Sequence, residues 1–231
     1  MRQFLSTVSV LVLLQGLPGM VLWTPQAIAQ SPTPPSSNLG ADPIERVLAA
    51  RLMTNYPDGQ FYPERLVSRA ELASILVKAF ELNKRAAAMT RNLVVVQDVP
   101  PSFWAFNDIQ TVLKTGIMRG YRDNMFFPNQ RVSRAEALAI FAQAYGVFQF
   151  PDETVTRILS DYPDAAQIPD WAKKSMATAL YEGFVKLDDR RNINPLNPMT
   201  RGDMAYALSK FLERQNNPAP VLEGEYFRTT R

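Results

Sequence analysis

The sequence predicts an all-α fold built from three copies of one helix-loop-helix unit. The first observation is an internal repeat: residues 55–80 align with 120–145 without a gap, and 192–214 join them at an offset of 67. The second is a helix-start signature at the same place in each copy. The third is a set of apolar residues at helical spacing around these signatures. Because one helix pair buries a single face, the units are expected to pack on one another.

Residues 1–29 are predicted to be a signal peptide. Arg2 precedes an apolar stretch that is densest from Val8 to Leu14, and Ala27-Ile28-Ala29 forms an A-x-A cleavage pattern. The alternative is a retained membrane anchor, but a span needs about 20 apolar residues and this run is interrupted early. We therefore expect the protein to be exported, by a bacterium. A Pro/Ser-rich linker follows at 30–40.

The repeat register divides the remaining chain. Units are expected at residues 41–90, 91–150 and 151–215, with a flexible tail at 216–231. The first helix of a unit is clearest at Ser102–Met118, where the apolar stripe ends near a glycine.

Two tryptophans and one connector carry further structural expectations. Trp104 and Trp171 fall on matching positions of the first helices, and we interpret them as core anchors rather than as platforms for sugars. In the connector between the first two units, Leu93–Val96 is expected to form a short strand or a buried extended segment.

The composition argues against most enzyme classes. The 231 residues include no cysteine and no histidine, which excludes a thiolate nucleophile, Ser-His-Asp catalysis and His-ligated zinc. No cofactor or metal is expected. The formal charge of +3 comes without a basic block, so nucleic acid is not an expected partner. A hydrolase with two carboxylates stays open as a minor alternative, because retaining glycosidases need only such a pair.

The helix-start signature consists of a hydroxyl cap and an acid three residues later. Both side chains satisfy backbone N–H groups of the first turn, and each cap contributes about 0.5–2 kcal/mol. These residues are expected to be structural: Ser68, Glu71, Ser133, Glu136, Thr200 and Asp203.

An arginine follows each cap, at Arg69, Arg134 and Arg201. A cation in the first turn opposes the helix dipole by about 0.3–1 kcal/mol, so capping does not explain it. One explanation is a ligand anion held by free N–H groups and a guanidinium. The other is a salt bridge between units, for instance with Asp98 or Asp161. Three arginines in register favour the ligand site.

These motifs resemble the S-layer homology (SLH) family. The middle unit shows the ordered pattern Asp98, Trp104-Ala105, Gly116-Ile117, Gly120-Tyr121 and Phe126-x-Pro128, and ends in Ser133-Arg134-Ala135-Glu136. The mature chain is similar to three tandem SLH repeats, over residues 41–215.

The resemblance implies an all-helical, pseudo-threefold bundle that binds cell-wall polysaccharide without a covalent bond, through grooves between repeats. It also implies that the exported protein belongs to the bacterial cell envelope, in the periplasm or at the cell wall. It implies that the arginines engage the carboxylate of a pyruvylated or otherwise anionic sugar. Gly120 and Tyr121 would line one groove, and Asp98 and Asp161 would orient their neighbours. Because Leu187-Asp188 replace Gly-Tyr in the third unit, we expect Arg134 to bind best, Arg69 next, and Arg201 to be structural.

Two functions therefore compete. The first is an envelope protein that is not an enzyme and binds a cell-wall polysaccharide or peptidoglycan-linked glycan. The second is a degenerate scaffold that binds another envelope protein, which the divergent third unit favours. After signal cleavage no transmembrane segment is expected.

Overall fold

The computed structural model describes residues 42–89 and 94–217. The predicted signal peptide, the linker and residues 218–231 of the predicted tail lie outside the described residues. The chain divides into two units, 1–39 and 40–231, and every described residue belongs to the second. Over the described ranges the chain contains helices and no strands, so the predicted all-α class is confirmed.

Three long helices begin at the three arginines. They are α2 (Arg69–Ala79), α5 (Arg134–Tyr145) and α8 (Arg201–Asn216). The first helices of the units are shorter: α1 (Pro43–Ala49), α4 (Phe106–Lys114) and α7 (Lys173–Tyr181). The connectors supply α3 (Leu82–Ala87), α6 (Asp152–Ser160) and three 3-10 turns at Arg122–Asn124, Ala165–Gln167 and Asp170–Ala172.

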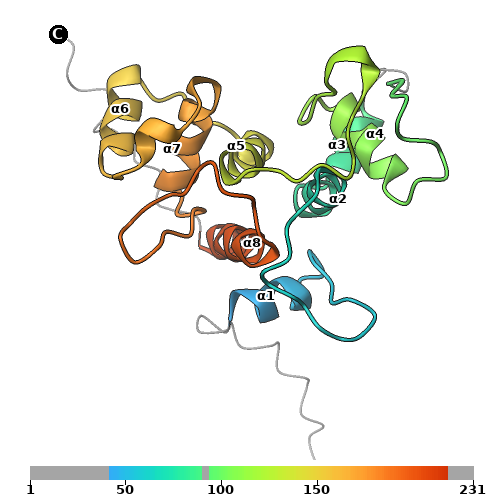
Figure 1. Cartoon of the computed structure of the whole chain (residues 1–231), viewed down its shortest axis with the longest axis horizontal. Helices are drawn as coiled ribbons and strands as arrows, with labels where there is room; N and C mark the ends of the chain where they lie inside the picture. Colours follow the sequence, from blue (N-terminus) through green and yellow to red (C-terminus); the bar gives the residue numbers. More distant parts are fainter. Residues whose placement is uncertain (1–41, 90–93, 218–231) are drawn as a thin grey trace, which may run out of the picture. The chain divides into compact units, whose positions relative to one another are not determined.

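Each first helix packs against a long helix of a different unit. Helix α4 packs against α2, and α7 packs against α5, so a first helix lies on the long helix of the preceding unit. Helix α1 packs against α8, which closes the same pattern between the two ends of the bundle. Figure 1 shows α2, α5 and α8 in the middle, with α1, α4 and α7 outside them.

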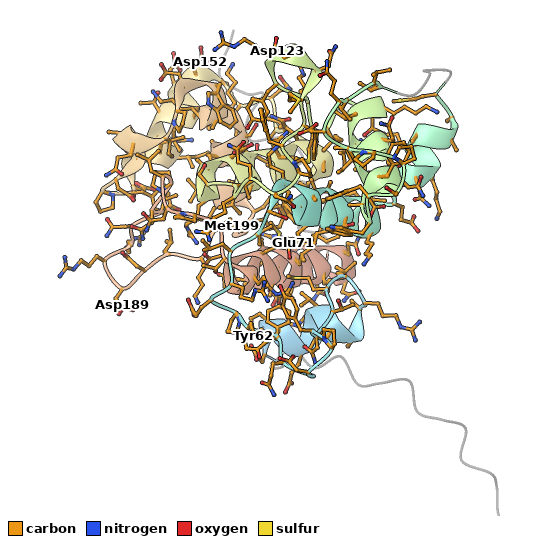
Figure 2. All side chains as sticks on the ribbon, turned by 45° about the vertical axis from the view of Figure 1, so that its right-hand side comes forward. Tyr62, Glu71, Asp123, Asp152, Asp189 and Met199 are labelled. Atoms are coloured by element: carbon orange, nitrogen blue, oxygen red, sulfur yellow. The ribbon has the colours of Figure 1, made fainter. Side chains whose placement is uncertain are left out.

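Three backbone hydrogen bonds join the units in a closed cycle. Val67 N donates to Met199 O (2.9 Å), Met199 N donates to Val132 O (2.8 Å), and Val132 N donates to Val67 O (3.2 Å). All three residues are buried, each directly before a helix cap, and Figure 2 labels Met199 near the centre of the bundle. The cycle places the three helix starts around one pseudo-threefold axis, as the resemblance implies.

Aromatic rings fill the space between the long helices. The ring of Phe141 on α5 lies 5.1 Å from that of Phe80 and 5.3 Å from that of Phe184, and a third contact joins it to Phe211 on α8. Their edge-to-face arrangement adds to the free energy gained by burying the rings. The core is therefore shared by all three units.

Two expectations about individual segments are wrong. Trp104 and Trp171 are 63% and 60% exposed, because the alanines that follow them take the buried positions and the helices begin only afterwards. Residues 94–96 form neither a strand nor a buried segment: Val94 and Val95 are exposed, and Val94 exchanges two hydrogen bonds with the side-chain amide of Gln110. Leu93 lies outside the described residues.

Candidate functional site: three arginines between repeats

The predicted caps open all three long helices. Ser68 Oγ accepts from Glu71 N (3.2 Å), Ser133 Oγ from Glu136 N (3.2 Å), and Thr200 Oγ1 from Asp203 N (3.0 Å). In the first copy Glu71 Oε2 also accepts from Ser68 N at 2.8 Å, which completes a reciprocal capping box.

The backbone N–H groups beside the arginines are not free for an anion. Arg69 N donates to Gln130 O and Ala70 N to Pro128 O, each at 2.9 Å. The second and third copies repeat this with Asn197 O and Pro195 O, and with Arg65 O and Pro63 O. Because loop carbonyls of the next unit occupy these donors, the expectation of free N–H groups at the helix starts is wrong.

The guanidinium groups bind carbonyl oxygens of the same loops. The Nε atoms of Arg69, Arg134 and Arg201 donate to Phe126 O (2.8 Å), Ile193 O (2.8 Å) and Phe61 O (3.0 Å). Their Nη2 atoms donate to Arg119 O, Lys186 O and Thr54 O. The three side chains are only 3%, 5% and 8% exposed. Each arginine therefore joins one unit to the next through two hydrogen bonds.

Two of the three arginines also form ion pairs with the acid of the next helix start. Arg69 Nη1 lies 2.7 Å from Glu136 Oε1, and Arg134 Nη1 lies 2.6 Å from Asp203 Oδ2. The salt-bridge explanation therefore holds for these two arginines, but the acids are not Asp98 or Asp161.

Asp98 orients a loop, as the family pattern implies. Its carboxylate accepts from Phe126 N (2.8 Å) and Phe127 N (2.6 Å), and so holds the loop whose carbonyls receive Arg69. In the third unit Asp164, not Asp161, binds Ile193 N and Asn194 N in the same way. Asp161 is an exposed residue at the end of α6.

Each arginine faces the Gly-Tyr position of the following unit and not of its own. The Arg69 guanidinium carbon lies 4.6 Å from the centre of the Tyr121 ring, so the Gly120-Tyr121 position lies beside Arg69. Arg134 faces Lys186 and the Leu187-Asp188 pair that follows it, whereas Arg201 lies over the Tyr56 ring at 4.8 Å. The basis of the expected order, which paired each arginine with its own unit, is therefore wrong.

Asp188 has a structural role within its loop. Its carboxylate accepts from the side chain and backbone of Asn192, and these hydrogen bonds are the largest reason why its pKa falls to about 2. Figure 2 shows the neighbouring Asp189 at the tip of this loop, away from the central helices. The loop that receives Arg134 therefore carries an aspartate at the position where the second unit has Tyr121.

The surroundings of Arg201 differ from those of Arg69 and Arg134, because the acid at the corresponding position, Glu71, is engaged elsewhere. Glu71 closes the capping box on Ser68 N, and no ion pair between Glu71 and Arg201 forms among the described residues. Arg201 Nη1 has no acceptor there either. Since every buried side-chain nitrogen of the described residues has a partner, Nη1 is open to solvent.

A cavity of about 210 Å³ is lined in part by Arg201. It is lined by residues of the loop after α1, by α2 and by one tryptophan: Leu52, Met53, Thr54, Asn55, Tyr56, Pro57, Glu71, Ile75, Lys78, Trp104 and Arg201. Lys78 is exposed and has no ion pair among the described residues. Two cations, two aromatic rings and the carboxylate of Glu71 thus line one cavity.

Sequence reasoning missed Lys78 and misplaced Trp104. Comparison of the three repeats could have drawn attention to this lysine. The matching position carries Gln143 in α5 and Lys210 in α8, so the charge at this position differs between the copies. Lys210 is bound to Glu213 at 2.8 Å, so Lys78 is the lysine of this position that has no acid partner in the described residues.

Residues 42–89 and 94–217 offer neither a membrane-spanning helix nor an acidic metal site. None of their helices has both the length and the apolar character that a membrane crossing requires. These residues also contain no group of three or more acidic side chains arranged to hold a metal ion.

The S-layer homology domain model matches residues 33–73, 98–138 and 161–205, which is more than half of the chain. The chain belongs to the S-layer homology domain family. The predicted resemblance is therefore confirmed, and the three matches agree with the three repeats.

Known relatives share this SLH part over a fraction of their length. The surface-layer 125 kDa protein of Lysinibacillus sphaericus is 28% identical over 180 residues, covering 77% of this chain and 14% of that protein. The cellulosome-anchoring protein of Acetivibrio thermocellus is 28% identical over 153 residues, covering 66% and 33%. Exoglucanase XynX of the same species is 27% identical over 181 residues, covering 78% and 16%. The chain thus spans a third or less of each of these relatives.

Proposed function

We propose that this SLH protein is exported and attaches to the bacterial cell envelope by binding an anionic cell-wall glycan without a covalent bond. The names of a surface-layer protein and a cellulosome-anchoring protein among its relatives support an anchoring function. The match to exoglucanase XynX covers only 16% of that enzyme, so most of the enzyme lies outside the matched part. This supports a function without catalytic activity for the matched part.

The observation that carries the proposal is the open Nη1 atom of Arg201, a residue that lines the cavity of about 210 Å³. A guanidinium already fixed by two carbonyls is preorganised, so binding a carboxylate there costs little side-chain entropy. Lys78 adds a second positive charge, and charge-assisted hydrogen bonds are the stronger kind.

Trp104 and Tyr56 complete the site for a sugar. Their flat rings offer an apolar surface to the C–H face of a pyranose, and the two cations hold an acidic substituent such as a pyruvate ketal. We therefore rank the Arg201 groove first. Arg69 comes next, because it faces Gly120-Tyr121 but is neutralised by Glu136, and Arg134 comes last, because Asp188 lies in its loop.

The test is sedimentation with sacculi from the bacterium that carries the protein. We expect Lys78→Ala to weaken binding about 10- to 150-fold, because one charge-assisted hydrogen bond contributes about 1.5–3 kcal/mol. Trp104→Ala should weaken it by a similar factor. Both residues are exposed, so neither change should lower the free energy of unfolding by more than about 0.5 kcal/mol.

The matched controls are Gln143→Ala and Trp171→Ala, which alter the same register positions in the next groove. If these controls weaken binding as much as the test variants do, the Arg201 groove is not the site. If no variant changes sedimentation, and removal of acidic substituents from the sacculi has no effect, the anionic glycan is excluded. A discrete protein partner after crosslinking would then support the scaffold function.

A further inference from the structure

A second cavity, of about 440 Å³, adjoins the proposed glycan groove. It is lined by Tyr56, Pro57, Asp58, Tyr62 and Arg65. Tyr56 and Pro57 also line the first cavity, so the two cavities are neighbours that share one wall. Figure 2 shows Tyr62 in the same part of the chain as α1, away from Asp123 and Asp152.

Tyr56 links the two cavities through its ring. The Arg201 guanidinium carbon lies 4.8 Å from the ring centre and that of Arg65 lies 4.3 Å from it. Tyr62 meets the same ring edge-to-face, with centroids 5.6 Å apart, and remains 42% exposed. The second cavity therefore presents an accessible aromatic surface beside the proposed site for the anionic sugar.

The polar groups of the second cavity balance one another. Asp58 is fixed by Gln60 N (3.0 Å) and by the Tyr62 hydroxyl, and the bond from that hydroxyl is the main cause that lowers the pKa of Asp58. Arg65 is exposed and has no ion pair among the described residues. One carboxylate and one guanidinium give no net charge, which suits an uncharged, hydroxyl-rich ligand.

We propose that this cavity is a second subsite, which takes an uncharged hexopyranose linked to the anionic sugar in the Arg201 groove. The hydroxyls of the hexopyranose donate to Asp58 and accept from Arg65, while its apolar face covers Tyr62. This proposal rests on the proposed function, since it extends the same glycan by one unit.

The subsite belongs to the first unit alone among the three copies. Phe127 and Gln130 stand where Tyr62 and Arg65 do, so the second copy lacks the hydroxyl and the cation. The third copy has Asn194 and Asn197 there. The left-handed backbone is common to all three, with φ of 52° at Tyr62, 55° at Phe127 and 53° at Asn194. The loop shape is thus a property of the fold, and the side chains make the subsite.

The test compares two probes by isothermal titration: the methyl glycoside of a 4,6-pyruvylated hexose, and a disaccharide that ends in the same pyruvylated hexose. We expect the unaltered protein to bind the disaccharide about tenfold more tightly. The variant Tyr62→Ala with Arg65→Ala should lose that gain and bind the monosaccharide as before. Phe127→Ala with Gln130→Ala is the matched control and should keep the gain.

The outcomes separate the two proposals. If the monosaccharide binds and the disaccharide gains nothing, or if the altered protein keeps the gain, the second subsite is overturned and the anionic groove stands. If neither probe binds the unaltered protein, the proposed function fails and the subsite fails with it.

Discussion

Arg69, Arg134 and Arg201 explain why a cation stands where the helix dipole disfavours it. Each side chain leaves its own helix start and donates two hydrogen bonds to carbonyl oxygens of the following unit. Bonds from a charged donor contribute about 1.5–3 kcal/mol each, which exceeds the dipole penalty of about 0.3–1 kcal/mol. The main role of each arginine is therefore to hold two units together. A guanidinium nitrogen without an acceptor, such as Nη1 of Arg201, is what leaves an arginine able to bind a ligand as well.

We predict that Arg134→Ala destabilises the bundle by about 3 kcal/mol, since it leaves two carbonyls and Asp203 without their donor. Urea unfolding followed by circular dichroism measures the change. Arg122→Ala, at an exposed position, is the control and should change the free energy of unfolding by less than about 0.5 kcal/mol. Equal stability of the two variants would contradict the fastening role.

The low pKa of Asp188 predicts how its loop responds to acid. Hydrogen bonds to the carboxylate lower the pKa from 3.8 to about 2 in the folded state. A lowered folded pKa means that the stabilisation is complete above pH about 4 and is lost as the pH falls toward 2. Carbon-13 NMR of the Asp188 carboxyl should show a midpoint near pH 2. A midpoint near 4 would show that the bonds to Asn192 do not persist in solution.

Sequence reasoning identified the caps and the importance of the arginines but not the partners of the arginines. The caps could be found because a Ser or Thr and its acid lie three residues apart. The acceptors of Arg69 are backbone carbonyls of residues 119 and 126, which any side chain could accompany, so no residue pattern marks them. Trp104 was expected in the core but is exposed. The repeat shows that a tryptophan recurs at this position, but it does not show whether the tryptophan or the alanine after it is buried.

Among the elements, the long helices were predictable and their partners were not. Helix α2 begins at Arg69, the residue after its predicted cap, because the cap and its acid are local signals. The contact of α4 with α2 rather than with α5 is a long-range property that the repeat leaves open, because neighbouring units carry the same faces. Each arginine likewise contacts the loop of the following unit, whereas the expected order paired it with the loop of its own unit.

The connectors show the limit for short elements. Helices α3 and α6 have only 6 and 9 residues and lie in segments without a repeat partner, so alignment could not support them. Helix α3 begins after Glu81, which has a left-handed backbone and makes no side-chain cap. Such helices depend on packing against their neighbours rather than on local sequence.

At the scale of the whole bundle, the contact of α1 with α8 turns a row of three repeats into a ring. Arg46 on α1 is paired with Glu213 on α8 and donates to Ser209 Oγ at 3.0 Å. The cycle of backbone bonds through Val67, Val132 and Met199 adds a second closure at the axis. In an open array each repeat contacts only its neighbours along the chain, and the ends can unfold separately. A ring has no such ends.

The ring predicts that a destabilising substitution in α1 also lowers the stability of the third unit. Val47 is fully buried on α1, and Val47→Ala should cost about 2 kcal/mol through lost burial and a small cavity. In a protein whose other tryptophans are replaced by Phe, the fluorescence of Trp171 and the circular dichroism of the helices should shift together to lower urea concentration. Val95→Ala, at an exposed site, serves as the control. Two separate transitions, with Trp171 unaffected by the change at Val47, would show that the repeats unfold as an open array.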